Sequence, residues 1–144
     1  KHHLNQALTI FPESRNTKHN LALIYDSTNE WDESDRLYTE LISSDSLDAQ
    51  AYNNFAYSLV ERSENLDLAL ELSLTAIRLS PQSAAYLDTA GWIYYKMKQF
   101  DKALKYIEES LEIDSSNITI QQHFNEIINN RTKLNEAKLQ QVEN

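Results

Sequence analysis

The stretch AAYLDTAGWIYYKMKQFDKALKYIEESLEIDSSN, residues 84–117, contains two segments with apolar residues at helical spacing. These residues recur at i, i+3, i+4 and i+7 in both segments: Leu87, Ala90, Gly91 and Tyr94, then Phe100, Ala103, Leu104 and Ile107. The spacing gives each of two helices an apolar stripe along one side. A short polar break, KMKQFD, separates the two segments and ends on Asp101, where a carboxylate complements the exposed amides of a helix start. The stretch is therefore predicted to form a helical hairpin.

The same pattern occurs twice more upstream. The segments 15–48, 49–83 and 84–117 can be aligned, so the chain contains repeats of 34, 35 and 34 residues. The polar breaks of the first two, STNEWD and RSENLD, again end on an aspartate, and the second break holds the extra residue. A fixed period of this length indicates stacked helical hairpins, so we predict an all-α fold and one domain over 1–144.

Residues outside the three repeats keep the same phase. The segment 1–14 is predicted to be the second helix of a truncated repeat, because its Pro12 aligns with Pro81. In the segment 118–144, Phe124 aligns with an apolar residue of the third repeat. We expect a degenerate fourth hairpin there, with one long capping helix as the alternative.

The repeats resemble the tetratricopeptide repeat (TPR) family, whose period of about 34 residues they share. The third repeat matches best, through Leu87, Gly91, Tyr94, Phe100, Ala103 and Leu111. The second matches through Tyr52, Phe55, Ala56, Leu59, Leu66, Ala69, Ala76 and Pro81. The first matches less well, because Ser34 and Leu41 replace small alanines. The amino-acid sequence of the second and third repeats is similar to that of repeats in bacterial TPR proteins. This resemblance implies a right-handed α-α superhelix with a concave groove lined by the first helix of each repeat.

Gly91 is the only glycine in the chain. It stands where the first helix of a repeat crosses the second, so the missing Cβ lets the two backbones approach. Ala22 and Ala56 occupy the same position in the other repeats. Glycine in a helix interior costs about 0.5–1 kcal/mol relative to alanine. We therefore expect close helix packing to offset that cost.

The resemblance implies that a partner binds on the concave wall. The residues expected there are His19, Leu23, Asp26 and Ser27; Asn53, Tyr57, Val60 and Glu61; and Asp88, Trp92, Tyr95 and Lys96. Leu23, Tyr57 and Trp92 occupy the same repeat position, one residue past the small one, so we expect an apolar ladder that faces the groove. Such a ladder favours an extended peptide or a partner's amphipathic helix.

Other aromatic residues are expected in the core, because aromatic side chains at helical spacing are more often buried than exposed. The residues predicted to be buried are Tyr25, Phe55, Tyr94 and Phe100. Tyr57 and Trp92 have packing against neighbouring repeats as their alternative.

The charge of the chain limits the class of partner. Its net charge is −9 and its 13 Lys and Arg residues are scattered, which argues against nucleic-acid binding. An acidic surface favours neutral or basic protein partners through long-range steering. Some TPR domains bind chaperone carboxylate tails through a clamp of Lys, Arg and Asn, and of the matching positions only Asn54 fits. A chaperone tail is therefore a poor candidate.

Signs of catalysis or of a bound cofactor are missing. The chain has no cysteine, no glycine-rich phosphate loop and no HExxH motif. Its histidines are His2, His3, His19 and His123, and the last is expected to form a surface pair with Glu126. We therefore expect no metal, no cofactor and no enzymatic activity in this chain.

No run of apolar residues is long enough to span a bilayer, so direct membrane insertion is not expected. The first residue is not Met, and we expect a fragment whose targeting signals lie outside it. The compartment stays open between the cytoplasm and a bacterial cell envelope.

Taken together, these features predict a non-enzymatic protein interaction scaffold. Two alternatives stay open at this point. One is a structural or self-association module of a larger assembly, and the other is the regulatory segment of a larger enzyme.

Overall fold

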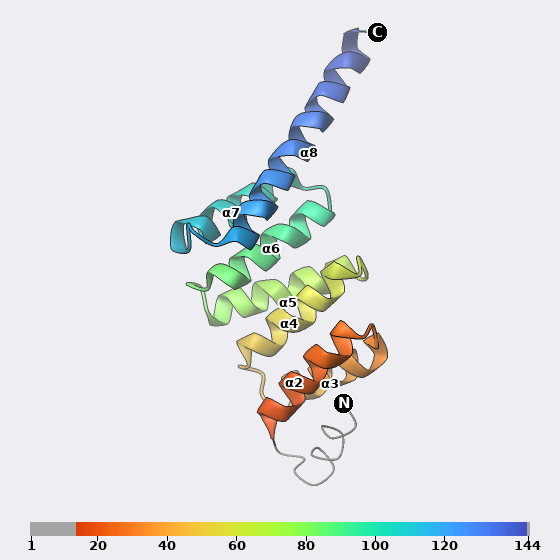
Figure 1. Cartoon of the computed structure of the whole chain (residues 1–144), viewed down its shortest axis with the longest axis vertical. Helices are drawn as coiled ribbons and strands as arrows, with labels where there is room; N and C mark the ends of the chain where they lie inside the picture. The colour runs from red at the N-terminus through yellow and green to blue at the C-terminus, as the bar shows by residue number, and fades with distance from the viewer. Residues whose placement is uncertain (1–13, 144) are drawn as a thin grey trace.

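The protein is built of helices, and the computed structural model describes its residues 14–143. The predicted leading helix over 1–14 lies outside the described residues except for Ser14, which precedes α2 as its cap. Within them there is no strand, and the helices in chain order are α2 (Arg15–Ser27), α3 (Trp31–Ser44), α4 (Ala49–Glu61), α5 (Leu66–Leu79), α6 (Ala84–Lys96), α7 (Phe100–Ile113) and α8 (Ile118–Glu143). Figure 1 shows these helices stacked along the long axis of the molecule.

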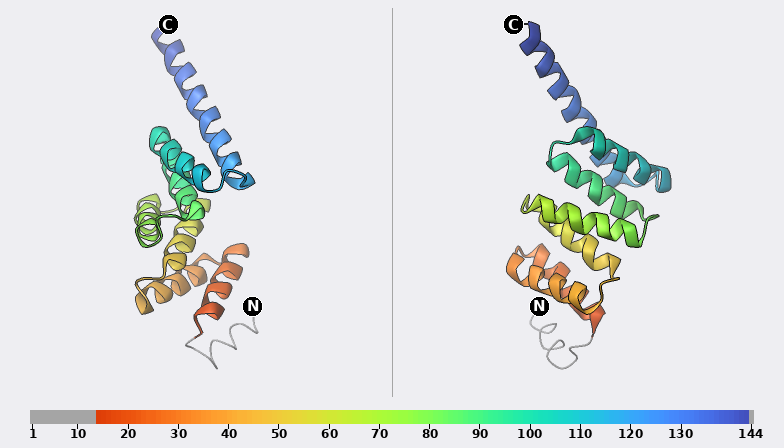
Figure 2. Two further views of the ribbon diagram at one scale, coloured as in Figure 1. Left: turned by 90° about the vertical axis from the view of Figure 1, so that its left-hand side faces the viewer. Right: turned by 180° about the vertical axis from the view of Figure 1, so that it is seen from behind.

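Consecutive helices pair into three hairpins, α2 with α3, α4 with α5 and α6 with α7. Packing is most extensive within each hairpin, and the second helix of a hairpin then packs on the first helix of the next. In the left view of Figure 2, α2 and the start of α8 stand out on the same side, while α4 and α6 are set back between them. The layer of first helices is therefore curved, and its inner face is the face between α2 and α8.

A polar cap recurs at the start of every first helix. Each cap side chain accepts a hydrogen bond from the backbone N–H three residues later, and the caps are Ser14, Asp48, Ser83 and Asn117. Serine, aspartate and asparagine are preferred at this position because their oxygen satisfies an amide that has no partner within the helix. The caps explain why each hairpin begins at the residue that the repeat period predicts.

The turn inside each hairpin uses the left-handed backbone region without glycine. Asn29 has φ 58° and Lys98 has φ 64°, while the middle turn, which holds the extra residue, has both Ser63 and Asn65 in this region. The predicted aspartates Asp32, Asp67 and Asp101 lie in the first turns of α3, α5 and α7. Their charge there favours the helix start.

Gly91 lies where α6 crosses α7, as predicted. A Cβ at this residue would be 2.7 Å from Cγ1 of Ile107 and 3.0 Å from the carbonyl oxygen of Ala103. Ala22 and Ala56, at the same repeat position, are fully buried. The glycine thus permits a closer helix crossing in the third hairpin.

The predicted core residues are confirmed for Tyr25, Phe55 and Tyr94, which are buried, and Phe100 is half-buried against the same core. Ser34 stands where alanine is usual and is fully buried. Its hydroxyl donates to the carbonyl of Trp31 at 3.1 Å, so no polar atom is left without a partner there.

Residues 118–143 form one helix, so the expected fourth hairpin is wrong and the capping-helix alternative is correct. The repeat alignment gives the physical reason. Asn125 falls at the position of Gly91, Ala22 and Ala56, where a side chain larger than alanine blocks a close crossing, and Lys138 and Gln141 replace the apolar Leu104 and Ile107. A second helix would have neither a close contact nor an apolar stripe to bury.

The two halves of α8 have different surroundings. The first half buries Ile120 and Ile127 against α6 and α7. From Thr132 to Glu143 every residue is exposed, and this half extends past the hairpins in Figure 1.

Candidate functional site

The three residues of the expected apolar ladder differ in exposure. Leu23 is 45% exposed and Tyr57 is 40% exposed, whereas Trp92 is only 7% exposed. The expected exposure of Trp92 is therefore wrong, and the side chains of Leu23 and Tyr57 are the accessible ones.

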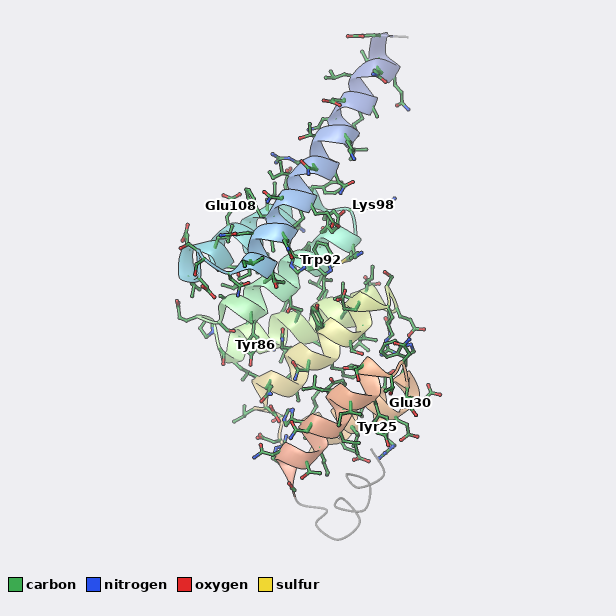
Figure 3. All side chains as sticks on the ribbon, viewed as in Figure 1. Tyr25, Glu30, Tyr86, Trp92, Lys98 and Glu108 are labelled. Atoms are coloured by element: carbon green, nitrogen blue, oxygen red, sulfur yellow. The ribbon has the colours of Figure 1, made fainter. Side chains whose placement is uncertain are left out.

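Trp92 is covered by α8, which crosses beside it in Figure 3. The ring of His123 stacks on Trp92 with 4.0 Å between ring centroids and 17° between planes. Nδ1 of His123 lies 2.9 Å from Oδ1 of Asp88 on α6. His123 thus pairs across helices with Asp88, and the expected surface pair with Glu126 is wrong. The repeat phase could have predicted this contact. It aligns the helix that begins at Ile118 with the first helix of a repeat, and that helix packs next to α6.

Tyr95 is also held by α8. Its hydroxyl oxygen accepts a hydrogen bond from Nδ2 of Asn130 at 2.7 Å. Burial, followed by the hydrogen bond to Glu126, raises the pKa of Tyr95 to about 12. The ammonium of Lys96 lies 5.1 Å from the centre of the Trp92 ring, within cation–π range. The inner face of the third hairpin is therefore closed by α8.

Asp26 joins three helices and is half-buried. It accepts a hydrogen bond from the hydroxyl of Tyr38 on α3 at 2.6 Å and another from Ser58 on α4 at 2.8 Å. Burial, followed by this bond to Asp26, raises the pKa of Tyr38 above its ordinary value. Asp26 thus connects the first two hairpins.

His19 and Asp48 form a second polar joint between these hairpins. Nε2 of His19 lies 2.8 Å from Oδ2 of Asp48, and Arg15 pairs with the same carboxylate. Burial alone would raise the pKa of Asp48, but the hydrogen bonds from Arg15, His19 and the N–H of Ala51 outweigh it and lower the pKa. His19 is buried, so its expected place on an exposed wall is also wrong.

The remaining residues expected on the concave wall differ in their exposure to solvent. Asn53, Asp88 and Val60 are all buried, so their expected place on an exposed wall is wrong. Val60 falls on the side of α4 that meets the core, because an aliphatic side chain is more stable away from water. Ser27, Glu61 and Lys96 are exposed.

Tyr57 combines an exposed ring with a fixed hydroxyl. The hydroxyl donates to Oε1 of Glu61 at 2.8 Å. Burial, followed by this hydrogen bond, raises the pKa of Tyr57 to about 12. The ring is therefore held in one orientation on the inner face, one repeat away from Leu23.

Among residues 14–143 there is no group of three or more His, Asp or Glu side chains that could hold a metal ion. In the same part of the chain, no helix combines the length and the apolar character needed to cross a membrane.

Comparison with known proteins identifies the repeats. A family model described as Tetratricopeptide repeat matches residues 47–116, and a second with the same description matches residues 19–50. The chain is 27% identical over 109 residues to the TPR repeat-containing protein PA4667 of Pseudomonas aeruginosa. That match covers 76% of this chain and 18% of the relative, so the chain spans less than a fifth of the relative's length.

Solved structures agree on the fold. The structure of pilF from Pseudomonas aeruginosa has a TM-score of 0.77 at 24% identity, covering 94% of this chain and 62% of that one. The first TPR of Spaghetti (RPAP3), bound to the HSP90 peptide SRMEEVD, has a TM-score of 0.75 at 16% identity, covering 82% of this chain and 93% of that one. The fold is thus the α-α superhelix of such repeats, a fold whose members are typically non-catalytic scaffolds. The chain belongs to the tetratricopeptide repeat family.

Proposed function

We propose that the inner face of α2 and α4 binds an extended peptide or an amphipathic helix of a partner protein. The observation that carries this proposal is the pair Leu23 and Tyr57, two large apolar side chains that are exposed at equivalent positions of successive repeats. Exposed apolar residues that line up along one surface mark interaction sites more often than isolated ones do.

Charge favours a neutral or basic partner. Residues 15–95 contain 13 Asp and Glu residues and 5 Lys and Arg residues, which gives a net charge of −8. Glu61, bonded to Tyr57, puts one of these carboxylates on the inner face. A basic or neutral segment would approach this surface without repulsion.

The two anchors do not suffice alone. Burying an apolar side chain stabilises a complex by about 1.5–3 kcal/mol, whereas association costs an estimated 4–15 kcal/mol. Further contacts along α2 and α4 are therefore required, and a partner that spans both helices supplies them. The peptide bound to the Spaghetti repeat supports peptide recognition by this fold, and the departures of the present chain from the carboxylate clamp speak against a terminal carboxylate as its ligand.

The test is selection of peptides from a random phage library on the wild-type protein. Selected peptides are then measured by fluorescence anisotropy against a Leu23→Ala/Tyr57→Ala variant whose helix content is checked by circular dichroism. We expect the double variant to lose at least tenfold in affinity, which corresponds to about 1.4 kcal/mol.

A matched control truncates two other exposed apolar residues, Leu47 and Ile118, which lie in an inter-repeat turn and at the start of α8. The Leu47→Ala/Ile118→Ala variant is expected to bind as the wild type does. Equal binding to both double variants would overturn the proposal. Concentration-dependent sedimentation that the Leu23→Ala/Tyr57→Ala change abolishes would instead identify the face as a self-association surface.

A further inference from the structure

A second surface lies at the other end of the chain, between the start of α7 and the projecting half of α8. A hollow of about 470 Å³ opens there, lined mainly by Lys98, Phe100, Lys102, Arg131, Leu134 and Lys138. A smaller hollow of about 230 Å³ shares Lys98 and Phe100 with it and reaches Lys96 and Tyr95. Because α8 does not turn back into a hairpin, its second half forms one wall of this space.

The lining is basic in an otherwise acidic molecule. Five of the chain's 13 basic residues line the two hollows, namely Lys96, Lys98, Lys102, Arg131 and Lys138. The acidic residue among the lining is Asp101, and it is paired with Arg131 at 3.4 Å. Five positive charges less one negative charge leave +4, against −8 for residues 15–95.

The hollow also has an apolar component. Phe100 is half-buried and Leu134 is 40% exposed, and both line the larger space. An apolar side chain can be covered between them, while the surrounding ammonium and guanidinium groups can bind carboxylates next to it in sequence.

We infer that this basic hollow binds an acidic peptide segment of a partner protein, with an apolar residue of the segment seated on Phe100 and Leu134. A membrane surface or a long nucleic acid fits less well, because both carry extended negative charge that the acidic repeats next to the hollow would repel. A short peptide places its carboxylates inside the hollow and leaves the rest of the acidic surface uncovered.

This site is separate from the inner face of α2 and α4. Its residues lie on the α6–α7 turn, on α7 and on α8, and neither Leu23 nor Tyr57 lines it. The two proposals therefore fail or hold independently, and the Leu23→Ala/Tyr57→Ala variant is expected to leave binding at the basic hollow unchanged.

The test uses a short fluorescein-labelled peptide in which glutamates surround a single leucine, measured by anisotropy on the full chain. In the test variant, Lys102→Glu/Lys138→Glu, both changed residues are exposed members of the hollow. In the matched control, Lys105→Glu/Lys133→Glu, the changed residues are exposed on the same two helices but outside the hollow, and the net charge changes equally.

We expect the Lys102→Glu/Lys138→Glu variant to bind the peptide at least tenfold more weakly than wild type, since two charge-assisted contacts become repulsive. The control should stay within about threefold of wild type, because Lys105 and Lys133 do not line the hollow and charges exposed to solvent are screened by salt. A peptide with glutamine in place of glutamate should not bind. Equal weakening in both double variants, tighter binding of anionic vesicles or of heparin than of the peptide, or no binding of the peptide by wild type would each overturn the inference.

Discussion

Leu23 and Tyr57 on one side and Trp92 on the other occupy the same position in three successive repeats, yet only the first two are open to solvent. The difference arises from the helix that comes after each repeat. Beyond the third hairpin lies α8, whose His123 stacks on Trp92 and pairs with Asp88. Exposure on the inner face is therefore set by the neighbouring helix as much as by the position of a residue within its own repeat.

The largest expected effect contrasts Trp92 with Tyr57 directly. Trp92→Ala removes a buried ring and should lower the free energy of unfolding by about 3–5 kcal/mol. Tyr57→Ala removes an exposed ring and should cost about 0.5 kcal/mol or less. Chemical denaturation followed by circular dichroism gives both values, and similar losses in the two variants would contradict the contrast.

Gly91 tests how far the third hairpin depends on its close crossing. Gly91→Leu would overlap Ile107 and should destabilise the protein by about 1–3 kcal/mol or more. The control is Ala137→Leu on the exposed half of α8, where no atom is displaced. A thermal melt in which Gly91→Leu is as stable as this control would disprove the crossing as the reason for the glycine.

The cover over Trp92 depends on His123, and its removal should make the third hairpin resemble the first two. His123→Ala loses an aromatic stack and should cost about 1 kcal/mol. In a Trp31→Phe background, Trp92 is the only tryptophan, so its emission should shift to the red and become more accessible to acrylamide. Gln122→Ala, an exposed change one residue away, is the control and should leave emission unaltered.

The smallest effect is expected in alkaline solution. Because the pKa of Tyr57 is raised to about 12 in the folded protein, the neutral hydroxyl stabilises the fold below the unfolded pKa of 10.0. This contribution is lost as the pH rises from about 10 toward 12. Tyr57→Phe should therefore lose less stability than wild type over this range, as measured by urea denaturation at several pH values. Identical slopes would show that burial and the Glu61 hydrogen bond do not raise the pKa of Tyr57 in the folded protein.

Local features of the fold could be predicted from the sequence. The helices of each hairpin and the close crossing at Gly91 depend on contacts within one hairpin. The spacing of apolar and small residues within one repeat therefore predicts both. The cover over Trp92 depends on how α8 packs on α6, which no pattern within the third repeat encodes. The repeat phase held the necessary information, because it aligns residues 118–130 with the first helix of a repeat, the helix that packs beside the first helix of the repeat before it.

The residues expected on the inner face could be predicted from the sequence to different degrees. Repeat position correctly predicted the exposure of Leu23 and Tyr57, but the same position wrongly predicted an exposed Trp92, which α8 covers. Asp26 and His19 were also expected on the inner face, yet Asp26 forms a hydrogen bond with Tyr38 and His19 pairs with Asp48. These partners come within reach only when the helices are packed. The basic hollow could not be predicted for a similar reason, because its lysines come from a turn, α7 and the far half of α8.

Asp48 has a consequence for the way the array unfolds. Its carboxylate caps α4 through the N–H of Ala51 and at the same time binds Arg15 and His19 of α2. In a repeat array, stability is the sum of each unit and its coupling to the next. Here one side chain contributes to both terms, so loss of the Asp48 cap would also remove the ion pairs that join α4 to α2. A partner bound across the first two hairpins would stabilise both sets of contacts at once.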